Sequence, residues 1–305
     1  MNLQQALPIS VAIATYRREG ILLETLDYLL GLLPAAAEIL VIDQSERHET
    51  TTQTRLKSLD ATGRIRWLRL DRPSIPHAMN RGLLEATQDI VLFVDDDIRP
   101  EPALLTSHLA AHQQHSDVLV AGRVVQPWQE GVDISILAKT PFAGMESSWI
   151  EDFIGCNFSV GRDTALALGG FDENFVRVAY CYEAEFAHRF RASERRVYFE
   201  PAACVHHLKS SAGGTRTFGE HLTTLKPDHA VGEYYYCLRT RSGWGRLKDF
   251  FIRPIRAVST RHHLRHPWWI PGTWFAEVWG MCWALSLHLR GPRYVTMPGK
   301  EAPLA

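Results

Sequence analysis

Three consecutive aspartates, Asp95, Asp96 and Asp97, directly follow the apolar residues 92–94 (LFV). Adjacent carboxylates repel one another, and aspartate is a poor strand residue, so the run needs a physical reason. A divalent cation would neutralise these charges, and oxygen ligands suit Mg²⁺ or Mn²⁺, with Mg²⁺ usually completing its shell with water and substrate phosphate. The alternative is a solvated acidic loop, but the apolar strand leading into the run favours carboxylates held at the mouth of a sheet.

Residues 183–216 supply groups that such a cation site needs. His206 and His207 offer a further ligand, and the glycine-rich segment SSAGGTR, residues 210–216, carries Arg216 and is typical of a loop that closes on phosphate. Glu183 and Glu185 lie near the start of a predicted helix. By default they form a solvated helix face.

The elements that position these residues alternate between strand and helix. Apolar strands are predicted at residues 9–14, 38–45, 64–70 and 89–94, and helices at 20–33, 77–87 and 101–115. Short apolar strands separated by helices predict a parallel sheet covered on both faces. Ligands bind beyond the carboxyl ends of such strands. Thr15, Arg17, Asp43 and the three aspartates all lie at predicted strand ends, so we expect them on one rim.

Composition excludes few classes of protein. The chain has 305 residues and a net charge of -1, so nothing global points to nucleic acid, and we expect no nucleic-acid partner. The five cysteines form no CxxC pair or zinc spacing, which suits free thiols in a reducing compartment. Residues 1–10 lack the pattern of a signal peptide. We therefore expect a cytoplasmic protein, or one held peripherally at the cytoplasmic face of a membrane.

The motifs occur in an order that resembles glycosyltransferase family 2. They are, in sequence, TYR after the first strand, a strand ending in Asp43, Asn-Arg-Gly in a helix, FVDDD, GCNFS, GGFDENF, an acidic helix, and P-x-A-x-V-x-H ending at His207. The resemblance covers residues 9–216. Each motif alone is weak, whereas the ordered set is specific. It implies the GT-A fold, a Rossmann-like central sheet flanked by helices, and inverting transfer of a sugar from a nucleotide-diphosphate donor.

The resemblance also implies roles for single residues. Those on the donor side are Thr15, Arg17, Asp43, Asn80, Arg81, Asp95, Asp96 and Arg216. Asp97 and His207, with Asp95 close by, would bind a divalent cation, Mn²⁺ or Mg²⁺, with His206 as the less favoured alternate. Asn157 resembles an acceptor-side residue. Glu183 occupies the position of the family's catalytic base.

Two departures from the family pattern leave alternatives open. Tyr182-Glu183 replaces the usual Glu-Asp pair, so Glu185 stays a candidate base. Residues two apart lie about 200° around a helix, so only one carboxylate can face the cleft. Glu185 precedes Arg189 by four residues, a favoured ion-pair spacing, which leaves Glu183 for the cleft. Met79 stands where the family often has arginine, and Arg81 is the candidate to replace its phosphate contact.

The C-terminal part differs in character. Residues 239–293 hold ten Lys/Arg and two acids, a net charge of +8, together with several tryptophans. Residues 268–289 are long enough to span a bilayer, but Pro271, Glu277 and His288 argue against a span. We expect either an interfacial region near anionic lipid or a pair of helices packed under the catalytic sheet.

Two regions follow from this reading. We expect a GT-A catalytic domain over residues 1–220, with its nucleotide-binding half at 1–125 and its acceptor half at 126–220, and a helical, basic region over 221–305. The predicted function is metal-dependent, inverting transfer to a sugar or lipid-linked acceptor hydroxyl in surface polysaccharide or glycolipid synthesis. The alternatives are a Mg²⁺-dependent nucleotidyltransferase and a catalytically dead carbohydrate-binding relative.

Overall fold

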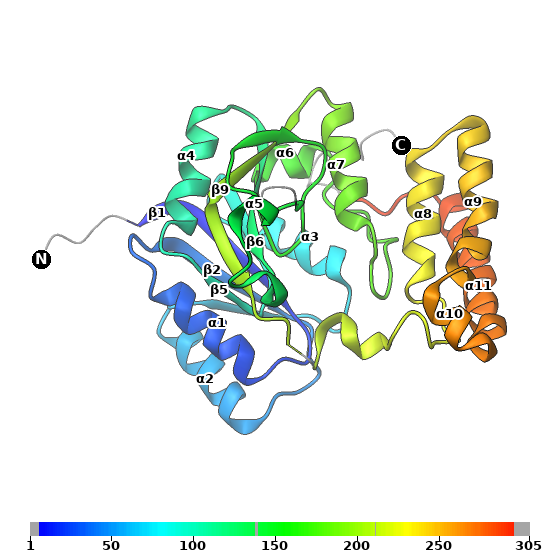
Figure 1. Cartoon of the computed structure of the whole chain (residues 1–305). Helices are drawn as coiled ribbons and strands as arrows, with labels where there is room; N and C mark the ends of the chain where they lie inside the picture. Colours follow the sequence, from blue (N-terminus) through cyan, green and yellow to red (C-terminus); the bar gives the residue numbers. More distant parts are fainter. Residues whose placement is uncertain (1–5, 138–139, 211, 296–305) are drawn as a thin grey trace, which may run out of the picture.

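The computed structural model describes residues 6–137, 140–210 and 212–295 and has an α/β fold with a helical C-terminal region (Figure 1). The predicted fold class is confirmed. The strands are β1 (Leu7–Thr15), β2 (Ala36–Asp43), β3 (Arg66–Arg69), β4 (Ile90–Val94), β5 (Ile98–Pro100), β6 (Val118–Val125), β7 (Ser148–Ile150), β8 (Asn157–Gly161) and β9 (Arg196–His207). The α-helices are α1 (Gly20–Leu30), α2 (Thr50–Ala61), α3 (Ile75–Glu85), α4 (Leu104–Gln114), α5 (Ile134–Leu137), α6 (Arg162–Ala167), α7 (Tyr182–Ala192), α8 (Ala230–Thr240), α9 (Gly243–Val258), α10 (Arg261–Arg265) and α11 (Ile270–Leu289).

The sheet runs in the order β3-β2-β1-β4-β8-β6-β9-β5, with β7 beside β9. Strands β1 to β4 are parallel, as the alternation of strands and helices predicts. The second half is mixed, because β8 runs antiparallel to both β4 and β6. Thr15 pairs with Asp43, and Ile13 pairs with Val94, the residue before the aspartates. The expected rim at the strand ends is therefore present.

Alternate residues of the strands face two different cores. On β1, Ile9, Val11 and Ile13 belong to a core with leucines of α1, α2 and α4. Ala12 on β1 and Phe93 on β4 instead belong to a core with apolar residues of α3, α6 and α7. This alternation is what period-2 strand geometry requires when both faces are covered. The covered sheet fixes the strand ends, and so fixes the rim.

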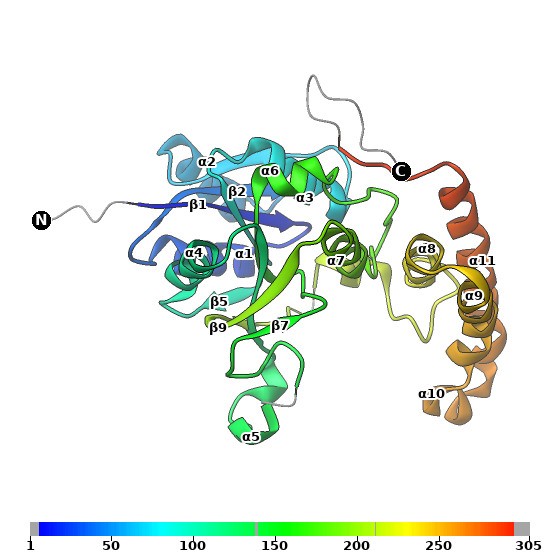
Figure 2. The same cartoon turned by 90° about the horizontal axis from the view of Figure 1, so that it is seen from above.

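The C-terminal helices extend the second of these cores, because Val231 and Tyr234 of α8 and Ala284 of α11 belong to it. Figures 1 and 2 show α8, α9 and α11 side by side next to α7, rather than under the sheet. Gly280 of α11 lets that helix approach α8 closely, since a Cβ there would lie 2.8 Å from that of Ala230. Glu277 joins the three helices, because it accepts a hydrogen bond from Tyr234 at 2.8 Å and pairs with Arg253 at 3.1 Å. Within the described residues, none of the helices has the length and apolar content to cross a membrane.

Candidate active site

An arginine neutralises part of the aspartate run. The guanidinium of Arg18 lies 3.2 Å from a carboxylate oxygen of Asp96 and 3.4 Å from one of Asp97, and all three side chains are buried. The backbone N–H of Ser210 donates a further hydrogen bond to Asp97 at 2.8 Å. Burial still raises the pKa of Asp96 to about 7, although the charge of Arg18 opposes this. The run is thus held at the strand end by Arg18 and by the following loop.

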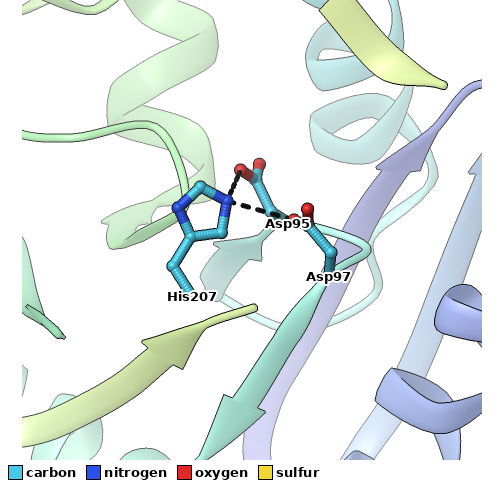
Figure 3. Close-up of side chains that lie close together, drawn as sticks. All are labelled: Asp95, Asp97 and His207. Carbon is cyan, nitrogen blue, oxygen red and sulfur yellow. Dashed lines mark hydrogen bonds and ion pairs between the residues drawn. The ribbon is translucent and has the colours of Figure 1, made fainter. Parts of the chain in front are cut away.

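Asp95, Asp97 and His207 converge on one point from the other side. One ligand atom from each lies within 4.8 Å of the other two (Figure 3). His207 Nε2 lies 3.1 Å from Asp97 Oδ1 and 3.7 Å from Asp95 Oδ2. Two carboxylate oxygens and an imidazole nitrogen are a suitable ligand set for Mn²⁺ or Mg²⁺. The residues present therefore fit the cation that the family resemblance implies.

One contact orients His207 within this cluster, whereas the neighbouring His206 lies elsewhere. Gln126 Oε1 lies 3.3 Å from His207 Nδ1, so it can accept a hydrogen bond from Nδ1–H, which leaves Nε2 free as a ligand. His206 lies 2.8 Å from Glu101 and 3.5 Å from Glu130, on the opposite side of β9, because neighbouring strand residues face opposite ways. Burial opposes protonation of His207, but its hydrogen bond to Asp97 and the two carboxylate charges outweigh burial and raise its pKa.

A cavity of about 440 Å³ joins this cluster to Glu183. Asp95, His207 and Glu183 all line it, and burial raises the pKa of Asp95 to about 6 and that of Glu183 to about 8. Gly155 forms the wall beside Glu183. A Cβ on Gly155 would clash with the hydroxyl of Tyr182 and lie 2.8 Å from Glu183 Oε1. The cavity therefore holds a carboxylate that stays protonated to a higher pH than an ordinary glutamate does, close to a cation-binding cluster.

Glu185 faces away from this cavity. It is 1% exposed, and its two oxygens accept hydrogen bonds from Arg189 at 2.8 and 2.9 Å. The same arginine donates to the carbonyls of Leu168 and Gly170. The predicted Glu185–Arg189 ion pair is confirmed, and it anchors α7 to the loop after α6.

Several residues assigned to the donor side engage protein groups instead. Asp43 is fully buried, with its oxygens bonded to the Ser45 amide, His48 and the indole N–H of Trp67. Thr15 is buried beside Asp96, and Arg17 forms an exposed ion pair with Glu46. None of these three residues presents a free polar group to the cavity.

The remaining assigned residues lie further off. Asn80 is buried and exchanges two hydrogen bonds with the backbone of Phe171, and Arg81 pairs with Glu85. Arg216 is exposed and donates to the carbonyl of Ser210 within its own loop.

Asn157 is completely buried, with its amide donating to Ala203 O and Arg123 O and its carbonyl facing His108. It ties β8 to β6 and β9, and it does not line the cavity that holds Glu183. The segment SSAGGTR includes residue 211, which lies outside the described residues.

Four residues of the site were missed from the sequence. Arg18 follows Arg17 directly, so the second arginine after a strand end was a usable signal. Gly155 and Tyr182 lie within quoted motifs, but only the fold reveals that they shape the space around Glu183. Gln126 lies in no motif, and nothing in its sequence context identifies it.

Comparisons with known proteins agree with this geometry. Residues 10–159 match the family model of glycosyl transferase family 2. A curated relative, the glucosyl-dolichyl phosphate glucuronosyltransferase of Haloferax volcanii, is 24% identical over 225 residues, which is 66% of this chain and 69% of the relative.

Two solved structures share the fold. The mannosyltransferase PcManGT of Pyrobaculum calidifontis, in complex with GDP-Man and Mn²⁺, has a TM-score of 0.55 and 17% identity over 95% of this chain and 80% of its own. GalNAc-T7, with UDP, GalNAc and Mn²⁺, has a TM-score of 0.63 and 14% identity over 83% of this chain. The match spans only 51%, about half, of the GalNAc-T7 chain. Sequence motifs, family match and fold agree: residues 10–159 carry the glycosyl transferase family 2 domain, and the chain is a glycosyltransferase with the GT-A fold.

Proposed function

We propose that this enzyme transfers a sugar from a nucleotide-diphosphate donor to an acceptor hydroxyl in one inverting, cation-dependent step. The observation that carries the proposal is the shared cavity: Asp95 and His207, which form the cluster together with Asp97, line the same space as Glu183. A single displacement needs one base and charge stabilisation on the leaving group, and it needs no covalent nucleophile.

Asp95, Asp97 and His207 would hold the divalent cation against the donor diphosphate. When bound, the cation stabilises the negative charge that develops on the departing phosphate oxygen. Gln126 keeps His207 in the tautomer that presents Nε2 to the cluster. Arg18 holds Asp96 and Asp97 in place from behind, so that their mutual repulsion does not open the site.

Glu183 would accept the proton of the acceptor hydroxyl. The acceptor oxygen attacks the anomeric carbon, the bond from that carbon to phosphate breaks, and its electron pair leaves with the diphosphate. The proton passes to a carboxylate oxygen of Glu183. A pKa of about 8, raised by burial, makes the ionised carboxylate a stronger base than an exposed glutamate near neutral pH.

We place the donor's nucleoside against Gln44, Ser74 and Met79, which line the cavity. Gln44 directly follows the buried Asp43 in the sequence. The loop at residues 210–216 already contacts the rim, since Arg18 donates to Ala212 O and Gly214 N–H donates to Tyr16 O at 2.8 Å. We infer that this loop closes further over the diphosphate and that Arg216 then turns from Ser210 to phosphate.

The acceptor is a sugar or lipid-linked hydroxyl, in surface polysaccharide or glycolipid synthesis. The name of the Haloferax volcanii relative, a glucosyl-dolichyl phosphate glucuronosyltransferase, supports the lipid-linked form. A lipid-linked acceptor requires the enzyme to contact a membrane. We propose that this contact is at the cytoplasmic face of the membrane.

The surface of the C-terminal helices supports such contact. Large apolar side chains are exposed at Trp244, Leu247, Phe251, Ile255, Leu264 and Trp268. Exposed basic residues, among them Lys248 and Arg256, accompany them, whereas Asp249 is paired and Glu277 is buried. This combination suits an anionic lipid surface.

A panel of nucleotide sugars tests the proposal. Purified full-length enzyme with Mn²⁺ should release free nucleoside diphosphate from one donor class, and excess chelator should stop the release. A nucleotidyltransferase would release pyrophosphate from a nucleoside triphosphate instead. A carbohydrate-binding relative without activity would release neither product.

A further inference from the structure

A second hollow lies directly beside the donor cavity, between the catalytic part and α11. It measures about 710 Å³, and its main side chains are Tyr16, Arg177, Phe218, Lys226, Trp279 and Trp283. We name it the α11 groove. Tyr16, Arg177 and Phe218 line both the α11 groove and the cavity that holds Glu183. The two spaces therefore meet along one wall.

The α11 groove combines cations with aromatic rings. Arg17, Arg177 and Lys226 line it together with one acid, Asp228, and Arg17 also pairs with Glu46 outside the lining. Arg177 is 55% exposed and lies 3.6 Å from Asp228, a distance at which a partly solvated pair holds its members weakly. The guanidinium of Arg177 also sits 5.8 Å from the ring centre of Trp283. The groove thus offers positive charge at its junction with the cavity.

Aromatic surface lines the opposite side. Trp279 is 50% exposed and belongs to the same face of α11 as Trp283, four residues on. Exposed indole surface gains free energy when a partner covers it. Two tryptophans beside basic residues are therefore typical of a surface that binds an amphiphilic partner. A free sugar needs aromatic faces too, but it would gain nothing from the excess of cations.

The cavity wall that begins at Arg177, a residue lining both spaces, has an unusual backbone conformation. Arg177, Ala179 and Cys181 all have left-handed backbone angles, with φ of 63°, 55° and 69°. Such angles are uncommon for residues other than glycine, and three within five residues need external support. Gly232 of α8 supplies part of it, because any Cβ there would clash with the backbone of Tyr180. This fixed wall leads into Glu183.

We infer that the α11 groove binds the acceptor, and that this acceptor carries a phosphate group next to its reacting part and an apolar chain beyond it. Arg177 at the junction and Lys226 within the groove contact the phosphate, and Trp279, Trp283 and Phe218 cover the chain. The reacting hydroxyl then enters the cavity past Arg177 toward Glu183. The role as acceptor site rests on the proposed function, whereas the binding chemistry is testable without donor or transfer.

Isothermal titration calorimetry of the full-length protein provides that test. Octyl phosphate is the probe, and octanol and inorganic phosphate are its two halves. We expect octyl phosphate to bind at least tenfold more tightly than either half, because the groove engages charge and chain together. Trp279→Ala and Arg177→Gln should each weaken that binding at least fivefold. Trp274→Ala is the matched control: Trp274 lies on the same helix and is 51% exposed, but it does not line the groove.

Each outcome decides the question. Equal binding of octyl phosphate and inorganic phosphate would reduce the groove to an anion site and overturn the assignment. An equal loss in Trp274→Ala and Trp279→Ala would mean general adsorption to α11 and would overturn it too. If Arg177→Gln fails to fold, Lys226→Gln carries the same expectation from an exposed position. No nucleotide sugar is present in this titration, so octyl phosphate can bind the groove even if the enzyme does not transfer sugar as proposed. A failure of the groove assignment is therefore distinguishable from a failure of the proposed function.

Discussion

Lowering the pH from 8 to 6 should reduce kcat/KM about fiftyfold through Glu183 alone, because the carboxylate is about half ionised at pH 8. Burial raises the pKa of this carboxylate from 4.5 to about 8. At pH 6, two units lower, about one carboxylate in a hundred is ionised, and only the ionised form accepts the acceptor proton. Activity should therefore rise about tenfold per pH unit and level off above pH 8.

The assay is nucleoside diphosphate release from pH 5.5 to 9 under saturating Mn²⁺. Asp95 and Asp96 also have raised pKa values. If ionisation of Asp95 caused the rising limb of the pH–activity profile, more Mn²⁺ would shift that limb to lower pH, because the cation binds the ionised carboxylate. A limb due to Glu183 should stay in place. Glu183→Gln should lose at least about a hundredfold in turnover and lose the limb as well. A wild-type profile that is flat between pH 6 and 8, or a Glu183→Gln variant that keeps the limb, would refute the assignment.

Other predictions concern the parts around the base. Donor with Mn²⁺ at a hundred times its dissociation constant should stabilise the wild type by about 2.7 kcal/mol, and Asp97→Asn should lose that shift in thermal denaturation. Donor with Mn²⁺ should slow proteolysis at residues 210–216, and Gly213→Ala should abolish this protection, because at φ 74° its Cβ would clash with the backbone of Arg17. Gly219→Ala is the control, because it has a similar φ of 75° but open space around its Cβ. Glu185→Gln should cost about 3–5 kcal/mol of unfolding free energy, because it leaves its buried arginine partner uncompensated, and unchanged chemical denaturation would contradict this. Phe251→Glu should reduce salt-sensitive flotation with anionic liposomes, and equal flotation of both proteins would remove the membrane contact from α9.

The sequence predicts the first half of the sheet because its strands are apolar runs separated by amphipathic helices. Predicted strands at 9–14 and 89–94 correspond to β1 and β4, and the helix at 101–115 to α4. The antiparallel β8 carries no such signal, since its pairing with β4 and β6 joins segments far apart in sequence. α2 was missed because its few apolar residues, such as Leu56 and Leu59, are diluted by polar ones.

For the site, spacing along a strand or helix was informative and side-chain partners were not. The spacing of Glu183, Glu185 and Arg189 predicts which carboxylate is paired, and the ion pair is present. Nothing local reveals that Asp43 is enclosed by His48 and Trp67, because burial depends on residues from other elements. Arg17 and Arg18 both follow the end of β1, and the folded rim shows that Arg18 reaches the aspartates whereas Arg17 pairs with Glu46.

The stereochemistry of the product tests the central claim most directly. With the donor that supports transfer, proton NMR of the first product formed should show an anomeric configuration opposite to that of the donor. One equivalent of nucleoside diphosphate should accompany each bond made. Glu183 in a cavity shared with Asp95 and His207 predicts this inversion, because one base and one displacement leave no covalent intermediate. Retention of configuration would contradict the account.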